Sequence, residues 1–150
     1  MKIKVQDLLS LLLSFVLFPT ITAAQQGAPG GEWPDYGGDL GSTKFAPLSQ
    51  IDKTNVENVS IAWMWHSPDD ELVAENPRLR PGAFKATPLM VNGVLYIQTS
   101  LSLLAAIDAV SGEQLWAFDP LSHEAGCPVN LGFNARGVAH WKEGDDSRIF

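Results

Sequence analysis

The chain has 150 residues, of which 18% are charged and 45% are hydrophobic, and its formal net charge is −7. This apolar content excludes a disordered acidic tail. The ten Lys and Arg residues never cluster, which disfavours nucleic-acid binding through phosphate neutralisation. A single cysteine, Cys127, excludes an internal disulfide, and together with the three histidines it lacks the spacing of a structural zinc site.

The first 24 residues predict a secretory signal peptide rather than part of the fold. A short cationic start with Lys2 and Lys4 precedes an apolar run over residues 8–18, and small residues follow up to Ala24. The run is shorter than the roughly 20 residues that cross a bilayer, so an uncleaved anchor is the less favoured alternative. We expect cleavage after Ala24, no other membrane span, and a flexible leader over residues 25–31.

The stretch 86–119 predicts a four-stranded antiparallel sheet. Short apolar runs alternate with turn residues there. The pair Asn92-Gly93 favours a tight type I′ hairpin, because both residues tolerate positive φ. Both faces of the sheet are apolar, so the sheet must be covered on both sides, as a blade of a β-propeller is. We expect strands over residues 86–91, 94–99, 103–108 and 113–118.

A second unit begins near residue 135. Residues 135–141 are similar in character to residues 86–91, and residues 142–147 predict the hairpin turn that follows. The offset between the two units falls in the propeller range of roughly 40–50 residues. The chain then stops in mid-strand, which would leave an apolar edge unpaired. We therefore expect an all-β propeller fold and the N-terminal piece of a longer protein, with one complete blade at about 86–119.

Two segments upstream of the sheet also carry predictions. Residues 59–66 predict a strand of a blade completed by distant downstream residues, with Trp63 and Trp65 filling the core rather than stacking on a flat ligand. Residues 69–82 predict a polar, Pro-containing loop. The acidic run that starts at Asp69 is interpreted as a solvated turn, because it lacks the offsets of a cation site.

Residues 106–116 carry a motif with the spacing Ala-x-Asp-x-x-x-Gly-x-x-x-Trp. Gly112 permits a positive φ, and Asp108 can accept the N–H groups of the turn. Trp116 offers a large flat face to a following blade. The motif resembles the tryptophan-docking motif of propellers that bind pyrroloquinoline quinone (PQQ). The resemblance to PQQ-dependent dehydrogenases extends over residues 32–150, through parts of 33–51, 87–96 and 136–141.

This resemblance implies an eight-bladed propeller of four-stranded antiparallel blades, with PQQ on its axis and a calcium ion that polarises the quinone. Arg136 matches the family's arginine that contacts PQQ oxygens, and its guanidinium suits the carboxylates of PQQ. A surface or interblade salt bridge is the alternative role. Lys85 stands where many relatives carry a cofactor-contacting Glu. It could pair with a PQQ carboxylate, or it could mark a chain that binds PQQ differently or not at all.

The resemblance further implies the N-terminal portion of a periplasmic quinoprotein dehydrogenase. Such an enzyme oxidises an alcohol, sugar or polyol and passes electrons to ubiquinone or cytochrome c. The catalytic base and the calcium ligands would lie beyond Phe150, so we expect this chain alone to be inactive. The lone Cys127 excludes the vicinal disulfide of the alcohol-oxidising branch, which favours the sugar or polyol branch. The alternatives are a non-enzymatic envelope scaffold that binds other proteins and a solute-binding propeller.

Overall fold

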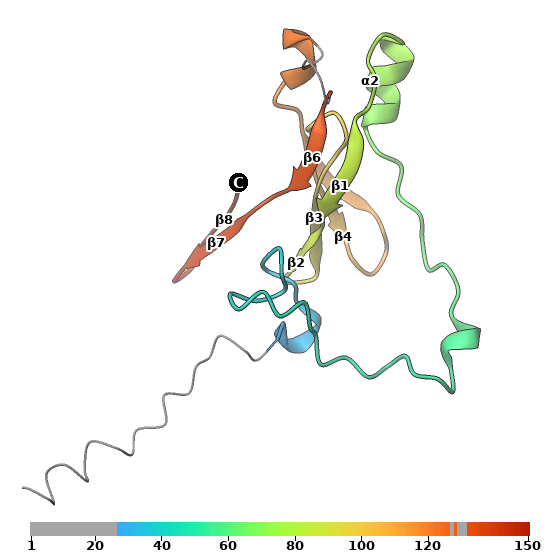
Figure 1. Ribbon diagram of the computed structural model, residues 1–150, viewed down its shortest axis with the longest axis vertical. Coiled ribbons are helices and arrows are strands. Elements are labelled where there is room, and N and C mark those ends of the chain that lie inside the picture. The colour runs from blue at the N-terminus through green and yellow to red at the C-terminus, as the bar shows by residue number, and fades with distance from the viewer. Residues whose placement is uncertain (1–26, 127, 129–131) are drawn as a thin grey trace, which may run out of the picture.

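The computed structural model describes residues 27–126, 128 and 132–150. The predicted signal peptide and Cys127 lie outside these residues. None of the helices in the described part of the chain has the length and apolar character needed to span a membrane. The described residues are mostly short strands and connecting segments (Figure 1). In chain order the elements are η2 Pro29–Gly31, η3 Val56–Asn58, α2 Asp69–Glu75, β1 Ala83–Thr87, β2 Leu89–Val91, β3 Val94–Gln98, β4 Leu104–Asp108, β5 Gln114–Phe118, η4 Ser122–Ala125, β6 Asn134–Gly137, β7 His140–Glu143 and β8 Asp146–Ile149.

Strands β2 to β5 form a four-stranded antiparallel sheet in which each strand pairs with the next one along the chain. The predicted hairpin turn is present, with φ of +52° at Asn92 and +77° at Gly93. The register places Tyr96 opposite both Leu89 and Ala106. The structure therefore matches the antiparallel sheet expected here from alternating apolar runs and tight turns.

Pro88 interrupts the strand that the sequence predicts over residues 86–91. Proline has no N–H group for the ladder, so it separates β1 from β2. Strand β1 is not part of the four-stranded sheet but pairs in parallel with β6. The predicted strand over 135–141 is divided in the same way, into β6 and β7. Both single-strand predictions are wrong for the same reason, because each segment contributes strands to two different sheets.

Residues 59–66 are extended but form no strand, so the prediction of a strand there is not met within the described residues. Ile61 and Met64 are 78% and 75% exposed. Trp63 and Trp65, on either side of Met64 in the sequence, are half-buried against the sheet. The indole nitrogen of Trp65 donates a hydrogen bond to Gln114 Oε1 at 3.1 Å. Side-chain contacts, rather than a backbone ladder, thus attach this segment to the sheet.

Residues 69–75 form helix α2, although the sequence predicts a loop over 69–82. The acidic start of this segment is not a solvated turn either, because Asp69 is only 5% exposed. Its carboxylate accepts hydrogen bonds from Thr99 Oγ1 at 2.6 Å and from the Leu101 N–H at 3.0 Å. Buried carboxylates need such partners, so Asp69 fastens the helix to the β3–β4 turn. Apolar residues complete the contact, namely Leu72, Val73, Leu79, Leu101, Leu103 and Phe133.

The opening segment is attached to the free edge of β2. Trp33 exchanges two backbone hydrogen bonds with Met90, at 2.8 and 3.0 Å. Residues 27–31 belong to the expected flexible leader, yet Ala28 is fully buried and its N–H donates to Phe45 O at 2.8 Å. The Gly27 N–H donates to Asp39 Oδ2 at 2.9 Å. A flexible leader therefore does not describe residues 27–31.

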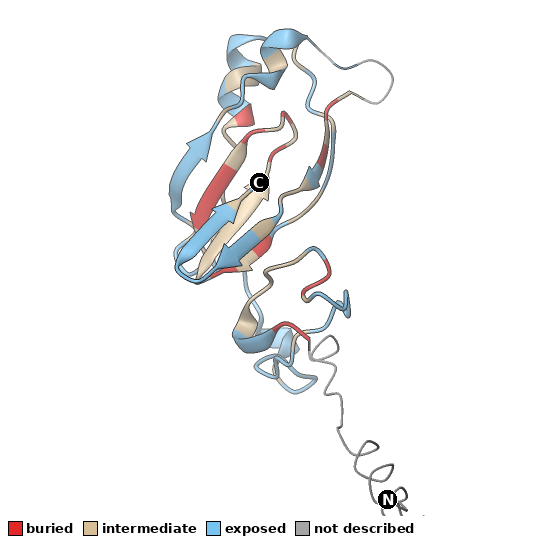
Figure 2. Ribbon diagram, turned by 90° about the vertical axis from the view of Figure 1, so that its left-hand side faces the viewer, coloured by how far each residue is buried: buried red, intermediate tan, exposed pale blue. Residues whose placement is uncertain are grey.

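Burial is uneven across the four-stranded sheet (Figure 2). The centre of β4 is buried, with Ala105 and Ala106 fully covered and Ile107 3% exposed. Every residue of the edge strand β5 is exposed, including Trp116 at 42%. The hairpin of β7 and β8 turns at residues 144–145, a narrower turn than the predicted 142–147, and Trp141 on it is also 42% exposed. Of these exposed aromatic residues, Trp116 is the one that the propeller interpretation places against a following blade.

Candidate cofactor site

The two predicted cofactor residues lie on neighbouring strands. Lys85 is the middle residue of β1, and Arg136 is the third residue of β6. These strands run side by side in parallel (Figure 1), with Phe84 opposite Ala135. The register then shifts before Thr87 pairs with Gly137, so that β1 has two residues where β6 has only Arg136. The shift thus falls at the predicted site residues themselves.

Both site residues are exposed cations. The ion pairs within the described part of the chain join Asp119 to His123 and Asp146 to Arg148, and neither includes Lys85 or Arg136. Among the described residues, Arg136 therefore has no carboxylate to form the salt bridge that is its alternative role. The described residues also contain no group of three or more His, Cys, Asp or Glu side chains that could hold a metal ion.

A third residue at the site, Gln98, carries no signal in the sequence. It is the last residue of β3. Its Oε1 atom accepts hydrogen bonds from the Arg136 N–H at 3.0 Å and from the Gly137 N–H at 3.1 Å. One carboxamide oxygen thus joins the four-stranded sheet to the strand that carries Arg136. Nearby on β6, Asn134 has a buried Oδ1 with no hydrogen-bond partner among the described residues.

The motif at residues 106–116 has the local geometry that the sequence predicts. Gly112 has a φ of +75°. Asp108 Oδ1 accepts hydrogen bonds from the N–H groups of Val110 at 3.0 Å and Ser111 at 2.7 Å. The bonds from the Ser111 N–H and hydroxyl, followed by that from Val110, lower the pKa of Asp108 below its usual value, because they stabilise the carboxylate. The turn is therefore fixed by its own side chain.

A tryptophan from a distant segment covers this turn. The Trp63 indole nitrogen donates a hydrogen bond to Ala109 O at 3.2 Å, and the ring lies so close to Gly112 that a Cβ there would come within 2.5 Å of it. Beside the ring is a hollow of about 420 Å³, lined by Trp63, Met64, Trp65, His66, Pro88, Leu95, Ile97 and Ile107. Trp63 and Trp65 thus cover part of one face of the sheet beside this hollow. Their place in a core stays a prediction.

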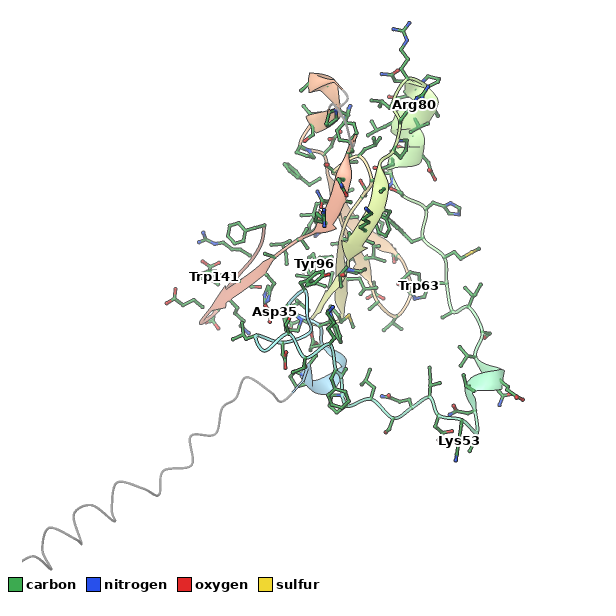
Figure 3. All side chains as sticks on the ribbon, viewed as in Figure 1. Asp35, Lys53, Trp63, Arg80, Tyr96 and Trp141 are labelled. Carbon is green, nitrogen blue, oxygen red and sulfur yellow. The ribbon has the colours of Figure 1, made fainter. Side chains whose placement is uncertain are left out.

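Trp116 lies on the opposite face of the sheet. Its ring is 6.0 Å from that of Tyr96, and Tyr96 alternates along β3 with Leu95, which lines the hollow beside Trp63. Figure 3 shows Trp63 and Trp141 on either side of the strands, with Tyr96 between them. Each face of the sheet therefore presents its own aromatic surface. Contact between Trp116 and a further blade stays a prediction.

The structure thus places two exposed cations on a parallel pair of strands, beside a four-stranded sheet whose glycine turn is covered by tryptophan. The sequence of this region matches a family model. The model described as "Glucose/ethanol/alcohol dehydrogenase, beta-propeller domain" matches residues 33–150. The chain belongs to this PQQ β-propeller family. Its mostly β structure with antiparallel sheets is consistent with that fold.

Individual members of the PQQ β-propeller family support the assignment. The chain is 37% identical over 127 residues to a quinohemoprotein alcohol dehydrogenase of Pseudomonas putida, covering 81% of this chain and 16% of the relative. It is 36% identical over 91 residues to the quinoprotein glucose dehydrogenase of Escherichia coli, covering 59% and 11%. The crystal structure of a quinohemoprotein alcohol dehydrogenase from Comamonas testosteroni aligns with a TM-score of 0.57 at 30% identity, covering 73% and 15%. The chain therefore spans about a sixth or less of these relatives, which come from both the alcohol and the glucose branches.

Proposed function

We propose that this chain is the N-terminal part of a PQQ-dependent dehydrogenase that acts on the CH–OH group of an alcohol, sugar or polyol. In this proposal residues 1–24 direct the protein to the periplasm, and ubiquinone or a cytochrome c receives the electrons. The sheet of β2 to β5 is one blade of an eight-bladed propeller, and Trp63 and Trp116 connect it to the blades on either side. The family membership of residues 33–150 supports this assignment.

The observation that carries the proposal is the pairing of β1 with β6. It places Lys85 and Arg136, both exposed and without a carboxylate partner among the described residues, on adjacent strands. PQQ is a quinone with three carboxylates, so two neighbouring cations match its charge. A guanidinium donates paired hydrogen bonds to carboxylate oxygens, and an ammonium acts as a compact point charge. The residues present therefore fit the cofactor.

In this arrangement the chain binds and orients the cofactor. Arg136 would hold one carboxylate of PQQ with directed hydrogen bonds, and Lys85, at the position where many relatives carry a Glu, would neutralise a second carboxylate. PQQ, when bound, supplies the two-electron acceptor for the oxidation of the alcohol carbon. The catalytic base and the calcium ligands come from other parts of the full-length protein. The 150-residue chain by itself is then expected to show no PQQ-dependent dye reduction.

The test is a titration of the full-length apoprotein with PQQ, followed by fluorescence quenching. We expect Arg136→Ala to weaken PQQ binding by about 10- to 100-fold, the effect of losing a charge-assisted hydrogen-bond pair. Lys85→Ala should weaken PQQ binding less, by about three- to tenfold, because an ammonium lacks the paired, planar hydrogen bonds of a guanidinium. Arg148→Ala is the matched control, since Arg148 is exposed and pairs with Asp146 on β8.

Unchanged PQQ affinity in Arg136→Ala would contradict the proposed role of this residue. Absence of PQQ binding by the wild-type protein would favour the alternative of a non-enzymatic envelope scaffold. Substrate oxidation by the PQQ-loaded wild type, measured with alcohols, sugars and polyols in parallel, then identifies the branch.

A further inference from the structure

The backbone at Arg136 is held from outside its own pair of strands. The β1–β6 register shifts at this point, and the N–H groups of Arg136 and Gly137 both donate to Gln98 Oε1. Gly137 has a φ of +114°, a conformation that favours glycine, and it pairs with Thr87 on the far side of the register shift. The Gln98 side chain therefore supplies a restraint that the irregular ladder lacks.

Gln98 is well placed to act as a rigid support. Its strand, β3, lies between β2 and β4 and is hydrogen bonded on both sides. Gln98 itself pairs with Leu104 at the end of the β3–β4 ladder. The residues that follow are held by the buried Asp69 and Thr99 contacts. The two hydrogen bonds thus join the Arg136–Gly137 segment to a strand of the four-stranded sheet that is itself paired on both sides.

We infer that Gln98 is a positioning residue for Arg136, fixing the peptide from which the guanidinium extends toward the cofactor. The inference rests on the proposed function, because it assigns Gln98 a role through Arg136. Holding a side chain in its bound direction before the ligand arrives reduces the ordering that binding must otherwise impose. Loss of the Gln98 acceptor therefore weakens PQQ binding even though Gln98 does not touch the cofactor in this scheme.

A double-mutant cycle on the full-length protein separates positioning from a merely structural role. Gln98→Leu keeps the side-chain size and removes the acceptor. We expect it to weaken PQQ binding by about three- to tenfold, because the N–H groups of Arg136 and Gly137 both lose their side-chain acceptor. In the Arg136→Ala background the same change should alter PQQ affinity by less than about twofold, since the guanidinium that Gln98 positions is gone.

The matched control is Gln114→Leu. Gln114 also accepts through Oε1, from the Trp65 indole, but it lies on the exposed strand β5. The Gln114→Leu variant should leave PQQ affinity unchanged. Because Gln98→Leu can fail to fold, Gln98→Asn is measured alongside it: it keeps the amide and shortens its reach by one methylene. Amide hydrogen exchange without PQQ should show faster exchange at Arg136 and Gly137 in both Gln98 variants.

The outcomes distinguish this inference from the proposed function. If the wild type does not bind PQQ, the proposed function fails and the inference with it. If Arg136→Ala binds PQQ as tightly as wild type, the proposed role of Arg136 and the inference that rests on it are overturned. If Arg136→Ala binds weakly but the Gln98 variants bind normally, only the inference is overturned. Equal weakening by Gln98→Leu in both backgrounds, or unchanged exchange at Arg136 and Gly137, would also overturn it.

Discussion

The four-stranded sheet of β2 to β5 and the parallel pair of β1 and β6 are assembled in different ways. In the sheet, each strand pairs with its neighbour in sequence across a short turn. In the pair, the two strands come from distant parts of the chain, and their register is interrupted. The pair is supported from outside, by the two hydrogen bonds to Gln98 and by the apolar cluster that includes Phe133, the residue before β6. The proposed cofactor residues lie in the region that depends on distant contacts.

The largest effect on stability is expected where helix α2, which precedes β1, is attached to the sheet. Asp69→Ala leaves the Thr99 hydroxyl and the Leu101 N–H buried without an acceptor. The free energy of unfolding should fall by about 2–4 kcal/mol, measured by urea titration of the full-length protein. The exposed neighbour Asp70 is the control, and Asp70→Ala should change the free energy of unfolding by less than about 0.5 kcal/mol. Similar losses in both variants would show that the attachment is not specific to Asp69.

A smaller effect is expected at the glycine turn of the sheet. Gly112→Ala places a Cβ against the Trp63 ring and also imposes a side chain at positive φ, so it should cost about 1–3 kcal/mol. Gly93→Ala is the matched control, because its φ is also positive but a Cβ there meets nothing within 4 Å. It should cost only about 1 kcal/mol. Thermal unfolding measures both variants, and equal costs would mean that Trp63 adds nothing at this turn.

The smallest effect is a pH dependence at the same turn. The pKa of Asp108 is lowered in the folded protein, chiefly by the Ser111 N–H bond, so its stabilising contribution is present above the usual value of 3.8. This contribution is lost as the pH falls through the lower, folded-state pKa. Asp108→Asn keeps an acceptor but cannot titrate. Its melting temperature should therefore fall less than that of wild type between about pH 5 and pH 2. Asp145→Asn, on the exposed β7–β8 turn, controls for the loss of one carboxylate.

The predictable parts of the fold are those in which local chemistry decides the structure. Asn92-Gly93 and Gly112 specify turns through their backbone freedom, and Asp108 completes one of them with its own carboxylate. The antiparallel sheet therefore follows from the sequence. Lys85 and Arg136 were identifiable only through the resemblance to a family, because a single cation carries no spacing pattern of its own.

The remaining features depend on contacts that the sequence does not show. Pro88 predicts an interrupted ladder but not that β1 joins a different sheet. Helix α2 has only seven residues, too few for a clear apolar period, although Pro68 followed by acidic residues is typical of a helix start. The burial of Asp69 and the role of Gln98 depend on partners 30 to 39 residues away.

The break at Pro88 has a mechanical consequence. One continuous peptide contributes β1 to the pair with β6 and β2 to the four-stranded sheet, so a displacement of either sheet is transmitted directly to the other. A ligand held by the proposed site residues on β1 and β6 would then also reduce fluctuations in strands that it does not contact. Slower amide exchange in β3 and β4 on addition of PQQ would report its binding at a distance.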